Sequence, residues 1–475
     1  MGGTGVALAR DGAAPFLNPA TIVRIAEQRL AFSVNLYSFA LLHFSDWHRP
    51  GPVDTAAFGD QNLGGTGLTE SNIRVLPSTL CLFFTLGDLA KLVDTEGPVE
   101  TKRTRARRKL AICFASLESE DVGLLAVHFE GGTGATTTSQ VQSVSQRWSR
   151  TYLGPTYSQV ITPSFAIGAS LQGVYTHDAF DIDGSAITGS LAGGAIDSTL
   201  GASGSGSSFE LTANLGATYR VGDTTFGANV QPPSLHVYGT YNATYAQTSG
   251  GSAGDSSVLV AGTGGLRAPP PMRFSLGVGV EKPRYTVEVD GALDVPYVSA
   301  IATTLSVVTN RLSSVGVSTA HTDENYVTAN HPTFNPSVGG EYFVSPSFSL
   351  LGGLAANLTS LSALTPAPSV GNLATARLSH ASASFGIGSY GEARELLLGF
   401  QLDYGWGQEL TINPYTVPND WAVVNAQSYA VMFIISGATD LRSIEHAFEH
   451  VKNAVTTGDP DVPPPKAAPP PSPGP

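Results

Sequence analysis

Long stretches of this chain alternate between apolar and polar residues, and this period of two constrains the fold more than any other feature. In the stretch RELLLGFQLDYGWGQ, which begins at Arg394, every second residue from Leu396 to Trp406 is apolar. The stretches that begin at Phe209 and Arg284 repeat the pattern. Strands of soluble sandwiches usually run about 5–6 residues. Longer strands with one apolar and one polar face are typical of a barrel that faces lipid outside and a polar lumen inside.

The composition excludes several other classes of protein. No uninterrupted apolar run approaches the roughly 18 residues that a membrane helix needs. The net charge of −13 argues against a nucleic-acid partner, because phosphate binding needs a basic surface. No Ser-His-Asp spacing, phosphate loop or pair of catalytic carboxylates stands out. We therefore expect no enzyme activity, no cofactor and no metal site.

The connections between the predicted strands alternate in length, which is the second sign of a barrel. We count about 14 strands, an even number, as single-chain bacterial barrels have. Short turns rich in Gly, Pro and Asp occur near residues 162–164, 222–223, 281–283, 345–346 and 391–394. Long links are predicted between them, for example Asp178–Ser208 and Ser299–Pro332. The fold class is therefore all-β, a transmembrane antiparallel β-barrel.

Several motifs together resemble the FadL/TodX family of outer-membrane transport proteins. The stretch GGTGVALARDGAAPFLNPA resembles the Asn-Pro-Ala segment of that family, and VLPSTLCLFF and PTYSQVITPSFAIGASLQGVY resemble its strand units. The resemblance implies a 14-stranded barrel in the bacterial outer membrane, with an N-terminal hatch in the lumen. It also implies uptake of long-chain fatty acids or other hydrophobic molecules, with a side exit near the third strand. A secretory signal peptide is implied but is not among the given residues.

The resemblance and the composition divide the chain into four parts. We expect the hatch at residues 1–29 and the barrel at 30–440. A short periplasmic helical segment is predicted at 441–458, and a proline-rich, disordered tail at 459–475. The expected partners are hydrophobic small molecules, outer-membrane lipid and lipopolysaccharide, and the chain is expected to act as a monomer.

Asn18, Pro19 and Ala20 form the hatch signature that the resemblance implies. Asn is a preferred helix N-cap, and Pro is favoured at the first helical position. The sequence therefore predicts that a helix begins at this point, whether or not the segment acts as a hatch.

Two sets of acidic residues are further candidates. Glu288, Asp290, Asp294 and Asp403 fall on polar faces and could mark a permeation path, or could simply pair with arginines in a polar lumen. Glu118, Glu120 and Asp121 interrupt an apolar stretch of the third strand, where the resemblance implies an inward kink. A plain turn between two short strands is the alternative.

Cys81 and Cys113 are the only cysteines. Both fall on the predicted lumen face of neighbouring strands. They could form a disulfide in an oxidising periplasm, or remain two buried thiols.

These observations predict passive uptake of a hydrophobic molecule across the outer membrane, with capture by the outer loops and a rearrangement of the hatch. The alternative is a structural or adhesive outer-membrane barrel that transports nothing.

Overall fold

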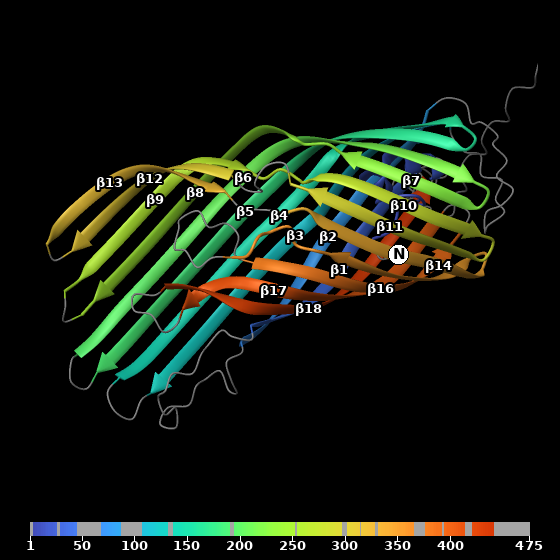
Figure 1. Ribbon diagram of the computed structural model, residues 1–475. Helices are drawn as coiled ribbons and strands as arrows, with labels where there is room; N and C mark the ends of the chain where they lie inside the picture. Colours follow the sequence, from blue (N-terminus) through green and yellow to red (C-terminus); the bar gives the residue numbers. More distant parts are fainter. Residues whose placement is uncertain are drawn as a thin grey trace, which may run out of the picture.

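The computed structural model is a closed antiparallel barrel (Figure 1). It describes residues 3–25, 29–44, 68–86, 107–131, 136–190, 194–251, 254–296, 302–313, 315–327, 331–364, 376–391, 394–413 and 420–440. The strands are β1 (Arg29–Phe44), β2 (Leu68–Thr85), β3 (Arg108–Gly131), β4 (Thr136–Thr162), β5 (Phe165–Ser190), β6 (Gly194–Val221), β7 (Thr224–Gln231), β8 (Leu235–Gly250), β9 (Ser256–Arg267), β10 (Met272–Lys282), β11 (Tyr285–Val295), β12 (Ala302–Ser313), β13 (Gly316–Val327), β14 (Thr333–Ser345), β15 (Phe348–Asn357), β16 (Ala376–Tyr390), β17 (Arg394–Asn413) and β18 (Asp420–Asp440).

The barrel closes because its first strand pairs on both sides. Arg29 of β1 lies opposite Phe83 of β2 and opposite Asp440 of β18. These eighteen segments form fourteen barrel strands, because β7/β8, β9/β10, β11/β12 and β13/β14 each continue one another along the chain. The predicted number of strands and the antiparallel barrel are confirmed.

Prolines lie at the splits in these four barrel strands. Pro232 and Pro233 separate β7 from β8, and Pro269–Pro271 separate β9 from β10. Pro296 follows β11, and Pro332 precedes β14. Proline has no N–H to donate to a neighbouring strand, so it interrupts a β-ladder. The four splits lie side by side, since Gln231 pairs with Arg273, Met272 with Val295, and Asp294 with Thr333.

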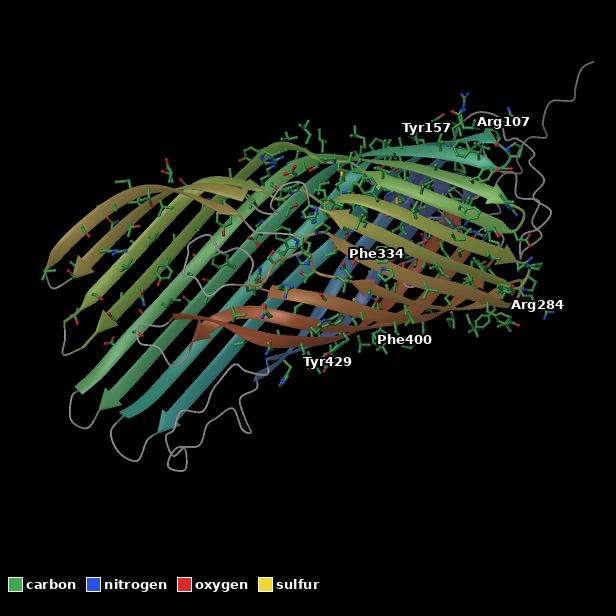
Figure 2. All side chains as sticks on the ribbon, in the orientation of Figure 1. Arg107, Tyr157, Arg284, Phe334, Phe400 and Tyr429 are labelled. Atoms are coloured by element: carbon green, nitrogen blue, oxygen red, sulfur yellow. A yellow bond between two sulfur atoms is a disulfide. The ribbon has the colours of Figure 1, made fainter. Side chains whose placement is uncertain are left out.

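The outer wall carries the predicted apolar face. The apolar residues of β17 from Leu396 to Trp406 are each 38–44% exposed, and Figure 2 shows Phe400 and Tyr429 projecting from this wall. Aromatic residues form two rows across neighbouring strands. One row is Phe165–Tyr219–Phe226 and the other is Tyr175–Phe209–Tyr238. Ten residues of tilted β5 separate the two rows, which corresponds to an apolar band about 25 Å tall between aromatic girdles.

The two ends of the barrel differ as the sequence predicts. Short turns at 163–164, 222–223, 283–284 and 346–347 gather at one end, where Figure 2 also shows Arg284. We call this the inner end, because short turns of bacterial barrels face the periplasm. At the opposite, outer end β4, β5, β6, β8 and β9 continue well beyond the aromatic row (Figure 1).

Some predicted boundaries are wrong. Asp178–Ser208, predicted to be a link, consists mostly of the outer halves of β5 and β6, and β12 and β13 occupy much of Ser299–Pro332. The plain turn considered for Glu118–Asp121 is also wrong, because β3 runs on to Gly131 and pairs with β4 throughout. The helical segment at 441–458 and the tail at 459–475 lie outside the described residues. In the described part of the chain, no helix has the length and apolar character needed to cross a membrane.

Candidate functional site

The N-terminal segment, residues 3–25, is the candidate site because it packs against the lumen face of the wall. It contains a one-turn helix α1 (Ala14–Leu17) and a 3-10 helix η1 (Pro19–Arg24). Most of its residues are buried, and η1 contacts β3, β4, β5 and β6. The site therefore consists of this segment and of the wall residues that hold it.

Glycines on the wall let the backbone of the segment lie directly on the strands. Gly168 pairs with Gly216 across β5 and β6, and Gly227 pairs with Gly277 across β7 and β10. A Cβ at any of these positions would come closer than 3.0 Å to another atom. At Gly168 that atom belongs to Pro19, at Gly216 to Asn18, and at Gly227 to Val6. The segment can pack this closely only because these wall positions lack side chains.

Two buried carboxylates bind four consecutive backbone N–H groups of the segment. Asp290 accepts hydrogen bonds from the N–H of Gly5 (2.7 Å) and Val6 (3.1 Å). Glu288 accepts from Ala7 (2.5 Å) and Leu8 (3.1 Å). Buried carboxyl oxygens require such donors, because a buried polar group without a hydrogen bond is costly. The i, i+2 spacing on β11 places both groups on the lumen face.

A third carboxylate and one lysine fix the segment at further points. Glu281, 4% exposed at the end of β10, forms ion pairs with both Arg10 and Arg24. The buried ammonium of Lys109 on β3 donates to the carbonyl of Ile25. The segment is thus bound to two different parts of the wall by charged groups.

Asn18 joins the segment to itself and to the wall. Its side-chain oxygen accepts a hydrogen bond from the N–H of Ala20 (3.0 Å), and Pro19 is the first residue of η1. Its amide donates to the carbonyls of Val6 (2.6 Å) and Ala217 (3.1 Å). The predicted N-cap is confirmed, with a 3-10 helix following it. The fully buried Asn18 side chain also links Val6, near the start of the segment, to η1.

The β2–β3 contact ends beside the segment. Only Thr79–Thr85 of β2 pair with β3, although β2 begins at Leu68 and β3 runs to Gly131. The pairing of β3 with β4 shifts register between Ser116 and Glu118, just past the last β2 pair at Ala115. The ring of Phe16 packs near this point, with its centroid 6.2 Å from that of Tyr152. The wall is therefore interrupted next to the segment.

Cys81 and Cys113 form a disulfide within the short β2–β3 ladder. The Sγ of Cys81 also lies 3.3 Å from the carbonyl oxygen of Gly12. Of the two alternatives left open by the sequence, the structure has the disulfide.

We expect thiol titration of the unfolded, unreduced protein to find no free thiol, and to find two after reduction. Two free thiols without reductant would contradict the disulfide.

The other predicted carboxylates are also paired, but away from the segment. Asp294 forms a bidentate ion pair with Arg273 (2.6 and 3.0 Å) and accepts from the amide of Asn335 (2.9 Å). The carboxyl group of Asp403 is hydrogen-bonded to the Nδ1 atom of His380 (2.6 Å). The structure describes the backbone of Glu118, Glu120 and Asp121, which lie on β3, whereas their side chains are outside the described residues.

The sequence did not identify the wall glycines on which the segment rests, and it did not identify the ion pairs of Glu281. Glycine at alternate positions of a strand was the available signal, but most of those strands contain several glycines.

Beyond the segment, the outer half of the lumen contains an apolar cluster, which we call the outer cluster: Phe180, Ile182, Leu200, Ala202, Tyr241, Ala243, Leu266, Val307, Val424 and Ala426.

Comparison with solved structures finds the same fold in a toluene transporter and in a FadL homologue. The toluene transporter TodX of Pseudomonas putida aligns with a TM-score of 0.55 at 14% identity, over 93% of this chain and 96% of that chain. A FadL homologue of Pseudomonas aeruginosa aligns with a TM-score of 0.52 at 14% identity, over 92% and 95%. No protein-family model matches the sequence, and no curated protein matches it. The resemblance to FadL/TodX is thus confirmed at the level of the fold.

Proposed function

We propose that this protein takes up hydrophobic molecules, such as hydrocarbons or long-chain fatty acids, across the bacterial outer membrane. The observation that carries the proposal is the N-terminal segment, whose described contacts with the lumen face of the wall are hydrogen bonds, ion pairs and packing. Non-covalent contacts can be released and re-formed. The shared fold with proteins described as a toluene transporter and a FadL homologue supports the same function.

The outer cluster is the proposed place of capture. Its side chains come from opposite parts of the barrel, for example Phe180 of β5 and Val424 of β18. Apolar side chains of this kind can enclose a hydrophobic ligand and so remove apolar area from water. The polar groups that a ligand would meet next belong to the wall around the segment.

The N-terminal segment is the proposed hatch, residues 1–29, with Asn18, Pro19 and Ala20 at its turn. Release of Gly5–Leu8 from Glu288 and Asp290 would open the lumen and leave these carboxylates facing the passage. Asp294 and Asp403 would extend the same polar path. This rearrangement is local, because it requires no break in the barrel ladder beneath the segment.

The interrupted β2–β3 contact is the proposed exit. Glu118, Glu120 and Asp121 follow the register shift in β3, which supports their assignment to a kink in the wall. Phe16 lies at the base of this interruption, between the hatch and the wall. A ligand above the hatch would leave sideways here once Phe16 moves.

Uptake in cells tests the function. Expression in a bacterial host that lacks its own transporter should raise the initial uptake of radiolabelled toluene or oleate at least severalfold. The host with an empty vector and a host expressing an unrelated porin of similar abundance are the controls. An unchanged rate for both probes would remove the transport proposal and favour the structural or adhesive alternative.

A further inference from the structure

The wall has a second interruption, between barrel strands β7/β8 and β9/β10. The ladder of β7 with β10 ends at Gln231 and Arg273, and the ladder of β8 with β9 begins at Tyr241 and Gly264. The residues between these points, 232–240 and 265–272, are all described and form no ladder with each other. We call this stretch the seam. It is distant from the β2–β3 interruption, since β3, β4, β5 and β6 lie between the two.

Prolines explain why the part of the seam next to β7 and β10 forms no ladder. Pro232 and Pro233 lie on one side, and Pro269–Pro271 lie on the other. None of these residues has an N–H to donate. In its place the chain makes isolated contacts, such as the hydrogen bond from the amide of Gln231 to the carbonyl of Pro271 (3.3 Å).

The two sides of the seam overlap instead of pairing edge to edge. A Cβ at Gly239 would overlap the carbonyl oxygen of Leu266, so the β9 side packs on the lumen face of β8. Leu266 and Ala268 are fully buried. The carbonyl of Ala268 accepts a hydrogen bond (3.4 Å) from Arg150 of β4, which belongs to another part of the wall. The β9–β10 connection therefore bends into the lumen.

The seam lies at the level of the outer aromatic row. Tyr238, within the seam, continues the row Tyr175–Phe209. On the outer surface Leu235 (67% exposed), Val237 (53%) and Tyr238 (58%) face the membrane. Aromatic rows of this kind mark the border between hydrocarbon and headgroups. The seam is thus next to the outer leaflet.

The lumen side of the seam is apolar as well. Leu266 and Tyr241 belong to the outer cluster, and Gly239 lies between them and the exposed Val237 and Tyr238. An apolar surface outside and an apolar cluster inside are separated here by the two overlapping backbone segments of the seam.

Separating the two sides of the seam costs less free energy than separating two strands of an intact ladder, because no ladder hydrogen bonds have to be broken. In hydrocarbon each broken backbone hydrogen bond leaves unsatisfied polar groups, and irregular backbone is tolerated only where it lines a cavity or is covered by protein. We propose that the seam is a side entrance through which hydrophobic molecules dissolved in the outer leaflet pass into the outer cluster. This inference rests on the proposed uptake function and adds the route by which the substrate enters.

Bridging the seam tests the proposal. Tyr238 and Arg267 are the chain neighbours of Gly239 and Leu266, which contact each other across the seam. The double variant Tyr238→Cys/Arg267→Cys, joined by a short bis-maleimide and verified by mass, should take up toluene at least about fivefold more slowly than the same variant left unbridged. The native cysteines are bonded to each other and do not compete for the reagent. The matched control is Asn242→Cys/Thr263→Cys, which bridges an existing ladder pair of the same two strands and should leave uptake unchanged.

A second pair of variants needs no bridge. Gly239→Ala should displace Leu266 and raise toluene uptake at least about threefold, because the added Cβ overlaps backbone. Gly265→Ala is its control, since a Cβ there meets its nearest atom at 3.7 Å. Equal uptake by bridged and unbridged seam variants, or equal effects of the two alanines, would overturn the side entrance. If the unmodified protein takes up no toluene, the proposed function itself fails.

Discussion

Replacing Gly216 or Gly227 by alanine is expected to displace the N-terminal segment and leave the barrel intact. At both positions a Cβ would overlap atoms of the segment, Asn18 in one case and Val6 in the other. Overpacking a close contact costs about 1–3 kcal/mol. Because roughly 1.4 kcal/mol corresponds to a tenfold change in an equilibrium, the ratio of released to bound segment should rise by about 5- to 150-fold.

Ion conductance in planar bilayers measures this release. Each alanine variant should show more frequent openings than the unmodified protein, and Gly216→Ala/Gly227→Ala should exceed either single variant. Gly352→Ala on β15 is the matched control, because its nearest atom, the carbonyl oxygen of Ser384, lies at 3.8 Å. Conductance that is the same in the control and in the two variants would show that the glycines do not hold the segment.

Removing the two carboxylates that bind the segment should have the larger effect. The variant Glu288→Leu/Asp290→Leu leaves the N–H groups of Gly5, Val6, Ala7 and Leu8 without their acceptors. A buried N–H group that loses its hydrogen bond costs about 1–3 kcal/mol. Loss of four such bonds should release the segment by at least about a hundredfold.

Trypsin cleavage reports this release independently of transport. The segment contains Arg10 and Arg24, and Arg24 is nearly buried in the bound state. Cleavage after Arg24 in the purified, folded protein should become at least about a hundredfold faster in the double variant. Asp294→Asn is the control, since Asp294 lies on the same strand but pairs with Arg273 and Asn335. Equal cleavage rates in the double variant and the control would contradict the assigned role of Glu288 and Asp290.

The sequence predicted the part of the barrel that touches lipid and missed much of the part beyond it. From Phe165 to Tyr175 the outward residues include Ile167 and Leu171, because hydrocarbon requires an apolar face. From Asp178 onward the outward residues of β5 include Asp181 and Asp183, which suit water, and the apolar Phe180 and Ile182 lie on the opposite, lumen face. The Ser- and Gly-rich outer halves of β5 and β6 therefore resembled loops, although their backbones pair along their full length.

The candidate site was predicted only where its chemistry is local. Asn18 and Pro19 are adjacent, and their capping geometry depends on neighbouring residues alone, so the sequence was sufficient. Glu288 was also placed correctly on a polar face. Its partners, the N–H groups of Ala7 and Leu8, are some 280 residues away along the chain, and no local pattern specifies them. The contacts of the wall glycines with the segment and the ion pairs of Glu281 also join residues far apart along the chain, so no local pattern predicts them.

By itself, the sequence determined which residues of the apolar band face lipid and which face the lumen, where the short turns lie, and where η1 begins. Each of these depends on neighbouring residues and on the solvent that they face. The tertiary structure alone decided that the segment rests on Gly168, Gly216 and Gly227, that Cys81 bonds Cys113, and that the proline splits line up into a seam. These features arise only when barrel closure fixes the register of distant strands, because register determines which side chains and which gaps become neighbours.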